Sequence, residues 1–352
     1  MKRVGIKDVA REAGVSPTTV SLVLNGQSAR IPDTTRDRVR RVATEIGYAP
    51  NSVARSLRTQ RTHTIALISD RIATTPFAVE MVQAAQDVAR EHGYLLLLVN
   101  TDGDHDVERE AVDALLSRQV DGMVYACMWS QVVDVPAGLP AGTVFLDGRP
   151  AGGGFPAVMP DDRAGAMAAV QELVDQGHTR IAYIDAGEEP VPIASRLRHE
   201  GYLEVLRRAG IEPDPSLRVE ASITTAAGGV AAAGELLDRP PAQRPTAIFC
   251  FNDRVAMGAY RAARHRGLEI PTDLSVVGYD DQQFIAAELD PPLTTVALPH
   301  YEMGRWAMQV RLGVLAAPTE NDGVHLMPCP LIRRESVAPP PAQHPAPAGD
   351  GE

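Results

Sequence analysis

The sequence is poor in cysteine and in aromatic residues. Its 352 residues include three cysteines, and aromatic residues make up 5% of the total. Cys127, Cys250 and Cys329 are far apart, form no CxxC pair and lie in or beside apolar runs, so we interpret them as buried thiols. We therefore expect neither a disulfide framework nor a cysteine zinc site.

Long apolar segments are also missing. No run approaches the roughly 18 residues of a membrane-spanning helix, and the N-terminal MKRVGIKDVAREAGV lacks the uninterrupted apolar core of a signal peptide. We therefore expect a cytoplasmic protein without a membrane partner. The length exceeds that of one compact core and predicts two or three folded units.

Motifs of the common enzyme classes are absent as well. The chain has no GxxxxGK followed by Ser or Thr, no GxSxG, no HExxH and no Ser/His/Asp arrangement. We therefore predict no catalytic residue, no metal site and no cofactor, and we expect that the protein is not an enzyme. A sugar kinase or hydrolase on an α/β scaffold is the alternative from another class.

The net charge of −11 is distributed unevenly. Residues 1–61 hold twelve Lys or Arg and five Asp or Glu, a charge of +7, which leaves −18 on the remainder. This division suits a small polyanion-binding head on an acidic body, because neutralisation of phosphates supplies most non-specific affinity for DNA. A solvated, charged helical segment is the alternative interpretation of the charge alone.

The pattern of apolar residues divides the chain further. Three short helical patterns, at about 6–13, 17–25 and 33–46, predict an all-α head over residues 1–48. Residues 49–61, APNSVARSLRTQR, form a basic connector with one helix-capable piece that Asn51 could cap. Residues 336–352, rich in Pro and Ala without an apolar face, predict a disordered tail.

Between the connector and the tail, residues 62–335, short apolar runs alternate with longer helical patterns. Such alternation predicts parallel sheets with helices on both faces, and the length favours two similar lobes, each doubly wound. We place the N-lobe at about 62–160 and 293–321, and the C-lobe at about 161–292 and 322–335.

The head contains a helix, a tight turn and a second helix in IKDVAREAGVSPTTVSLVLNG. The first helix breaks at Gly14, and Ser16 is suited to cap the second, with Pro17 at the first helical position. Val20 and Val23 should face back to the first helix. The other side chains of the second helix are then free for phosphates and base edges.

The motif IKDVAREAGVS…TVS…LN resembles the LacI/GalR family of transcription regulators, and the resemblance extends from Ile6 to about Ser336. It implies that Pro17, Thr18 and Leu22 occupy base-reading positions, where other members carry Arg or His in place of Leu22. Because Leu22 cannot donate to guanine, we expect apolar contact with a thymine methyl there. The full predicted DNA-binding set in the head is Lys7, Ser16, Pro17, Thr18, Thr19, Ser21, Leu22 and Asn25.

The connector segment NSVARSL is similar to the hinge helix of that family. The resemblance implies that two such helices pack together in the minor groove and that Leu57 wedges into the central base step, which kinks the duplex. A plain linker leucine is the alternative. The predicted hinge contacts are Asn51, Ala54, Arg55, Leu57 and Arg58.

Polar residues follow several apolar runs of the body, and open parallel sheets bind ligands beyond the carboxyl ends of their strands. These residues include Asp70, Asp147, Asn252 and Asp280. The body resembles the fold of periplasmic sugar-binding proteins. That resemblance assigns Arg198, Asn252 and Asp280 to polar effector contacts, Phe77 to an apolar wall and Asp147 to a further polar contact.

Carboxylates, an amide, an arginine and an aromatic face suit a polyhydroxyl ligand, so we expect a carbohydrate-type effector that controls DNA binding allosterically. Alternatives remain for each residue: helix capping for Asn252 and Asp280, a surface salt bridge for Arg198, and core packing for Phe77. Met128 and Trp129 could line the pocket or belong to the core. His178 is interpreted as structural, and the acidic run around His105 as helix capping.

These features together predict a repressor that binds a palindromic operator in double-stranded DNA as a homodimer. The residues after LIRRESV contain no leucine heptad that could join dimers into a tetramer. A secreted solute-binding protein is a second alternative, opposed by the basic helical head and by the N-terminal sequence.

Overall fold

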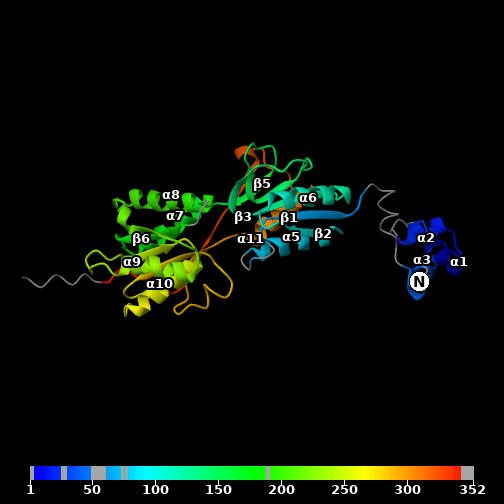
Figure 1. Cartoon of the computed structure of the whole chain (residues 1–352). Helices are drawn as coiled ribbons and strands as arrows, with labels where there is room; N and C mark the ends of the chain where they lie inside the picture. Colours follow the sequence, from blue (N-terminus) through cyan, green and yellow to red (C-terminus); the bar gives the residue numbers. More distant parts are fainter. Residues whose placement is uncertain are drawn as a thin grey trace, which may run out of the picture. The chain divides into compact units, whose positions relative to one another are not determined.

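The computed structural model describes residues 4–24, 30–48, 61–72, 75, 78–187 and 191–341. The chain separates into two compact units, Met1–His63 and Thr64–Glu352 (Figure 1). In the described part of the chain, no helix has both the length and the apolar character that crossing a membrane requires.

The described residues of the first unit form three helices, α1 (Ile6–Ala13), α2 (Pro17–Leu24) and α3 (Asp33–Glu45), close to the predicted spans. Helix α1 ends at Gly14, whose φ of 64° lies in the left-handed region that glycine adopts without strain. The helices share a core of small aliphatic side chains. These are Val9, Ala10, Ala13, Val20, Val23, Val39, Val42 and Ala43.

The second unit has two lobes, each built on a six-stranded sheet. In the N-lobe the strand order is β11-β5-β4-β3-β1-β2, and all described pairings are parallel. The strands are β1 (Thr64–Ser69), β2 (Leu95–Asn100), β3 (Gly122–Val133), β4 (Val144–Pro150), β5 (Ala157–Pro160) and β11 (Val324–Met327). Helices α5 (Val79–Glu91) and α11 (His300–Arg311) pack on one face, and α6 (His105–Ser117) packs on the other.

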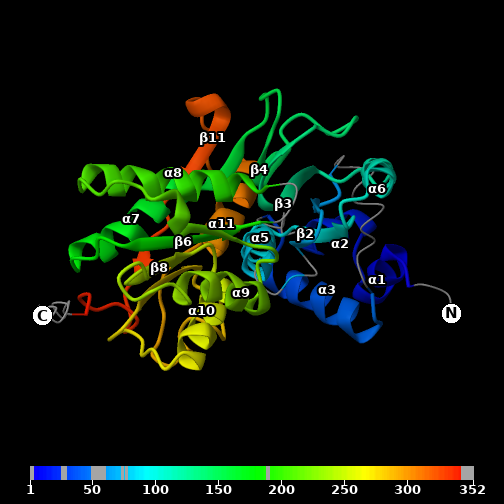
Figure 2. The same cartoon turned by 60° about the vertical axis from the view of Figure 1, so that its left-hand side comes forward.

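In the C-lobe the order is β12-β10-β9-β8-β6-β7, with only β12 antiparallel to its neighbour among the described pairings. The strands are β6 (Ile181–Ala186), β7 (Arg218–Ala221), β8 (Ala247–Cys250), β9 (Ser275–Asp280), β10 (Thr294–Ala297) and β12 (Leu331–Ile332). Helices α7 (Asp162–Asp175) and α8 (Ile193–Arg208) cover one face, and α9 (Ala226–Leu237) and α10 (Asp253–His265) cover the other (Figure 2). Two single 3-10 turns, η2 (Pro215–Leu217) and η3 (Asn321–Gly323), complete the described elements.

The chain passes between the lobes three times, and two predicted boundaries are wrong. The second passage was expected before residue 293, but β10 pairs with β9 in the C-lobe, so the chain leaves that lobe only after Ala297. The third was expected near residue 322, but β11 pairs with β5 in the N-lobe through Met327. The lobe to which β10 or β11 belongs is set by the strand with which it forms hydrogen bonds. The local sequence pattern does not show which strand that is.

The predicted tail also begins too early. Ser336 is fully buried, donates from its hydroxyl to the carbonyl of Val276 and accepts from the backbone N–H of Thr294 at 2.8 Å. The carbonyl of Ala338 accepts a hydrogen bond from the Ser275 hydroxyl at 3.0 Å. Residues 336–338 are therefore part of the C-lobe, and residues 342–352 lie outside the described part of the chain.

Candidate functional site

The second helix of the head is capped as predicted. The hydroxyl of Ser16 accepts a hydrogen bond from the backbone N–H of Thr19 at 3.0 Å, and α2 begins at Pro17. The Ser16 side chain thus replaces one of the hydrogen bonds that the first turn of a helix lacks. This cap fixes where α2 starts and therefore which of its side chains point outward.

Two faces of α2 differ in exposure. Val20 and Val23 are buried against the other head helices. The predicted DNA-contacting residues Lys7, Ser16, Pro17, Thr18 and Leu22 are exposed, and Thr19 and Ser21 are half-buried. Leu22 is 37% exposed, although it lies between the buried Val20 and Val23 in the sequence. The remaining predicted DNA contacts, Asn25, Asn51, Ala54, Arg55, Leu57 and Arg58, lie outside the described residues.

In the body, a narrow cavity of about 50 Å³ lies between the two lobes at the carboxyl ends of their strands. It brings together four of the predicted effector residues, Asp147, Arg198, Asn252 and Asp280. Met128 and Trp129 line it as well. The other described lining residues are Ala78, Ser130, Pro160, Ala194, Phe251, Arg254, Gln282, Leu298 and His300. We call this cavity the cleft.

Two predicted effector residues are not in the cleft lining. Phe77 lies outside the described residues. Asp70 lines a second, larger cavity of about 760 Å³, together with Tyr125, Cys127 and Val191. One carboxylate oxygen of Asp70 accepts hydrogen bonds from the Met128 N–H and from the Gln131 side chain, each at 3.1 Å. Trp129 lines both cavities, so they adjoin at this residue. We call the larger one the side cavity.

Arg198 is a buried anchor at the base of the cleft, not a surface salt bridge. Its Nε donates to Oδ1 of Asp162 at 2.8 Å, and its Nη1 donates to the carbonyl of Phe251 at 2.5 Å. The guanidinium lies 3.5 Å from the centroid of the Tyr279 ring. Burial lowers the pKa of Arg198, but the nearby Asp162, Tyr279 and Asp280 raise it by more, so the group remains charged.

Asp280 lies near the same guanidinium, with 3.7 Å between its Oδ1 and Nη1 of Arg198. Its other oxygen accepts a hydrogen bond from the Gln282 amide at 2.7 Å. Burial raises the pKa of Asp280 to about 6, although Arg198 and Gln282 act in the opposite direction. Asp280 therefore ends β9 and faces the cleft, and the described contacts do not make it a helix cap.

Asn252 does cap a helix, as the alternative interpretation held. Its side-chain oxygen accepts from the N–H of Val255 at 2.9 Å at the start of α10, and its amide donates to the carbonyl of Thr224 at 3.4 Å. It is 3% exposed and still lines the cleft. The next residue, Asp253, accepts from the Thr295 hydroxyl at 2.6 Å. Both polar groups are thus committed to internal hydrogen bonds.

Asp147 is the acidic residue of the N-lobe wall. Its carboxylate accepts from the hydroxyl of Ser130 at 2.7 Å. Burial is the largest effect on this group and raises its pKa to about 8; the Ser130 hydrogen bonds lower it, and the negative charge of Asp162 raises it. Asp147 therefore carries a proton for much of the time at neutral pH.

Several cleft residues have positive φ, a region in which residues other than glycine are uncommon. The φ angles of Trp129, Ser130 and Asp147 are 66°, 52° and 54° in the N-lobe, and that of Asp280 is 102° in the C-lobe. Trp129 and Ser130 belong to β3, and they lie where its pairing with β4 shifts register, between Ala126 and Gln131. Backbone strain of this kind clusters at functional sites because it aims particular side chains.

The remaining sequence predictions concern structural roles. His178 is buried and its ring nitrogens hydrogen-bond to Thr246, to Ser275 and to the carbonyl of Ala338, so its structural role is confirmed. Asp104 caps α6 by accepting from two backbone N–H groups, which confirms the capping interpretation of the acidic run. Within the described residues, no cluster of His, Cys, Asp or Glu is suited to hold a metal ion.

The sequence missed some cleft residues. Gln282 follows β9 and could have been found by searching after each apolar run, whereas Ser130 lies within β3 at its register shift, which the sequence does not reveal. His300 begins α11 just after the second passage between lobes. Asp162, which holds Arg198, gave no signal because its partner lies 36 residues away.

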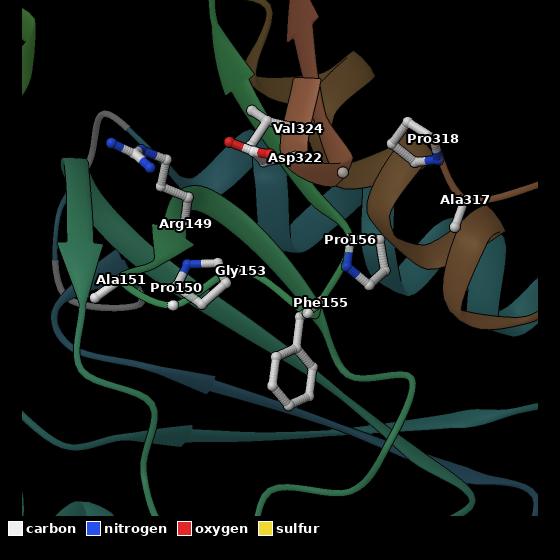
Figure 3. Close-up of a pocket in the computed structure, with 13 residues that line it drawn as sticks. Arg149, Pro150, Ala151, Gly153, Phe155, Pro156, Ala317, Pro318, Asp322 and Val324 are labelled. Atoms are coloured by element: carbon white, nitrogen blue, oxygen red, sulfur yellow. The ribbon is translucent and has the colours of Figure 1, made fainter. Parts of the chain in front are cut away.

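A third cavity, of about 610 Å³, lies beside the edge strand β11 of the N-lobe sheet. It is enclosed by the loop between β4 and β5 and by the residues just before β11 (Figure 3). Arg149 and Asp322 are its charged residues, and much of the rest is glycine and proline. The Phe155 ring turns away and packs edge-on against Phe145. The polar groups that line this third cavity do not converge as those of the cleft do, so the cleft is the candidate site.

The comparisons with known proteins agree with this division. Residues 5–51 match the family described as bacterial regulatory proteins, lacI family, and residues 170–337 match the periplasmic binding protein-like domain. The chain is 36% identical over 335 residues to the HTH-type transcriptional repressor CytR of Escherichia coli K12, covering 94% of this chain and 96% of that protein.

Two further similarities cover most of the chain. The ribose operon repressor of Escherichia coli K12 is 35% identical over 338 residues, covering 94% of this chain and 99% of the relative. The crystal structure of the Lac repressor dimer bound to operator and the anti-inducer ONPF has a TM-score of 0.74 and 27% identity, covering 96% of this chain and all of that chain.

Proposed function

The chain belongs to the lacI family of bacterial regulatory proteins, and on that premise we propose that it is a transcriptional repressor that binds operator DNA and is controlled by a small effector. One observation carries the proposal. A single chain joins a head with an outward-facing, capped helix α2 to a body with a polar cleft between two lobes. The head is suited to bind a DNA duplex, and the cleft of the body is suited to bind a small polar molecule.

The DNA-binding surface is the exposed side of α2 with its cap. Ser16 and Thr18 supply hydroxyls for phosphates, and Pro17 and Leu22 present apolar groups to base edges. Lys7 on α1 contributes a positive charge. The connector residues Asn51, Ala54, Arg55, Leu57 and Arg58 contribute the hinge contacts and, with Asn25, complete the interface.

The operator is palindromic and the protein binds it as a homodimer. The edge strand β2 exposes Leu95 and Leu98 by 62% and 41%, and Phe284 in the C-lobe is 87% exposed. Apolar side chains on a free strand edge invite pairing with another chain unless they are covered. A two-fold interface over these residues would cover them and would place two heads on the halves of a palindrome.

The effector binds in the cleft, against Asp147, Arg198, Asn252 and Asp280, and we infer a sugar or sugar derivative. The cleft offers carboxylates, which accept from hydroxyls, next to aromatic groups, which cover the C–H face of a ring. Its volume of about 50 Å³ is below the usual range of ligand pockets, roughly 300–1,000 Å³, so the lobes must separate to admit the ligand. This movement couples the cleft to the heads.

The proposal makes this a cytoplasmic regulator and not an enzyme. Arg198 is committed to its ion pair with Asp162 and Asn252 to the cap of α10, an arrangement that suits ligand binding. The test is a gel shift with duplexes recovered by selection from a random library. A specific shift that a cleft ligand alters supports the proposal, and the absence of any sequence preference contradicts it.

A further inference from the structure

The side cavity has the size of a ligand pocket and is formed by both lobes. Its volume of about 760 Å³ lies within the usual range for such pockets, roughly 300–1,000 Å³. Asp70, Tyr125 and Trp129 line it from the N-lobe, and Val191 and Ile193, at the start of α8, line it from the C-lobe. A molecule that fills this cavity therefore contacts both lobes.

The buried polar groups of this lining are hydrogen-bonded within the protein. One carboxylate oxygen of Asp70 accepts from the Met128 N–H and from the Gln131 side chain. The Tyr125 hydroxyl donates to Glu108, and these two side chains are 6% and 8% exposed. Because these groups already have partners, a polyhydroxyl ligand finds little unmet hydrogen-bonding capacity among them.

The charged side chains of the lining do not favour an ionic ligand of either sign. The acids Asp70 and Glu108 occur in the same lining as the basic residues Arg71 and His105. Arg71 and His105 are exposed to solvent, where an ion pair with a ligand contributes little. A neutral ligand therefore fits this mixture of charges better than an anion or a cation.

Exposed apolar side chains gather in the same lining. Trp129 is 42% exposed, Val132 is 45% exposed and Val191 is 53% exposed. Pro192 and Ile193 extend this surface and are half-buried. A ligand that covers these side chains gains the free energy of removing apolar surface from water. Since aromatic rings pair favourably with one another, Trp129 favours an aromatic ligand.

The side cavity is connected to the cleft through β3 and α8. Trp129 of β3 lines both cavities, and the next residue, Ser130, donates to Asp147 on the cleft wall. Helix α8, which begins at the side cavity, carries Arg198 at the base of the cleft. A side-cavity ligand that prefers one separation of the lobes would therefore shift the same equilibrium as a ligand in the cleft.

We propose that the side cavity is a second effector site, which takes a small, neutral aromatic compound distinct from the polyhydroxyl ligand of the cleft. The ring of this compound packs against Trp129, Val132 and Val191 and so joins the two lobes. Its influence on DNA binding rests on the proposed function, whereas its binding in the cavity does not.

The experiment uses the neutral naphthalene dye prodan as the probe and energy transfer from tryptophan as the readout. The sequence has two tryptophans, and Trp306 stacks on His325 of β11, with 5.1 Å between ring centroids. In full-length Trp306→Phe protein, Trp129 is the one remaining tryptophan, so sensitised emission reports dye bound near it. We expect saturable sensitised emission that benzyl alcohol reduces by competition and glycerol does not.

Substitutions in that background test where the dye binds. Val191→Asp and Val132→Asp place a charge in the C-lobe wall and in the N-lobe wall, at exposed positions where folding should not suffer. Each should weaken dye binding about tenfold or more, because an unpaired charge is costly to bury. Leu326→Asp, at a 47% exposed position on β11 outside the lining, should bind the dye like the parent. The site is overturned if no saturable transfer occurs or if Val191→Asp binds as tightly as Leu326→Asp.

Operator affinity with and without saturating dye tests the effector role. We expect a change of about fivefold or more, typical of coupling between two sites, and Val191→Asp should remove it. Unchanged operator affinity with the dye bound would overturn the role of this cavity as an effector site. A lack of sequence preference for DNA without dye would contradict the proposed function, while the dye titration, which contains no DNA, still decides whether the cavity binds.

Discussion

The Nε of Arg198 donates a hydrogen bond of 2.8 Å to Oδ1 of Asp162, and both side chains are almost completely buried. Asp162 begins α7 directly after the first passage between the lobes, and Arg198 lies in the second turn of α8. The pair therefore joins the first two helices of the C-lobe at the base of the cleft. It also fixes the guanidinium that Asp280 approaches from β9.

Removing this partner should destabilise the C-lobe strongly. Asp162→Asn leaves a buried arginine without its main counter-charge, which typically costs about 3–5 kcal/mol. The measurement is the free energy of unfolding in urea. Arg196→Ala removes an exposed pair with Glu200 on the same helix and should cost less than about 0.5 kcal/mol. Equal effects from the two variants would contradict the anchoring role of Asp162.

The stability of the body should depend on pH through Asp147. Because its folded pKa is raised to about 8, above the usual value for a carboxyl, the folded state holds a proton that the unfolded state has lost. The free energy of unfolding should therefore fall as pH rises from about 4 to about 8. Asp147→Asn should make that decline less steep, as measured by urea unfolding at several pH values.

The groups that face Asp147 set the sign of this effect. They are Ser130 and Cys127 of β3, Asp70 after β1, and Asp162 of α7. None of them is a cation, so none offsets the cost of ionising Asp147. Asp113→Asn, which removes an exposed acid on α6, should keep the full slope. A slope unchanged by Asp147→Asn would show that the ionisation of this carboxyl does not limit stability.

Leu22 should determine base preference at one operator position. Its exposed side chain on α2 lies where other family members carry Arg or His, and an apolar group favours a thymine methyl. Leu22→Arg should shift the selected base toward guanine, at a discrimination of about 1–3 kcal/mol. Selection from a random duplex library with both proteins checks this, with Glu12→Gln on α1 as an exposed control. Identical selected sequences would remove Leu22 from the base-reading set.

The contact between α9 and α10 should tolerate no added methyl group at Gly258. A Cβ there would lie 2.4 Å from the Ala226 carbonyl and 2.6 Å from Gly229. Gly258→Ala should cost about 1–3 kcal/mol through overpacking. Gly152→Ala, in open space, is the matched control. Thermal unfolding measures both, and a Gly258→Ala protein as stable as the control would contradict the close approach of the helices.

Local signals in the sequence were sufficient for several of these features. Ser16 followed by Pro17 predicts the start of α2 because a cap depends only on residues three positions away. Asp147, Asn252 and Asp280 could be found because each comes just after an apolar run of the sequence, and side chains there lie near the carboxyl ends of the strands, where ligands bind. These rules need no knowledge of which strands are neighbours.

Features that depend on distant neighbours could not be predicted in this way. The return of β11 to the N-lobe depends on pairing with β5, whose residues lie 167 positions earlier in the chain, as for Val324 and Ala157. The partner of Arg198 depends on how α7 and α8 pack, and the outward turn of Trp129 depends on a register shift between β3 and β4. Ser336 resembled a disordered tail because its two hydrogen-bond partners lie far away in sequence.

The most direct test of the account is fluorescence anisotropy with the duplex recovered by selection and a scrambled duplex of the same composition. The account predicts tighter binding to the palindromic duplex, an affinity that falls steeply as salt rises, and a change in that affinity when a cleft ligand is added. Equal affinity for the two duplexes at every salt concentration, with and without simple sugars as candidate cleft ligands, would contradict it.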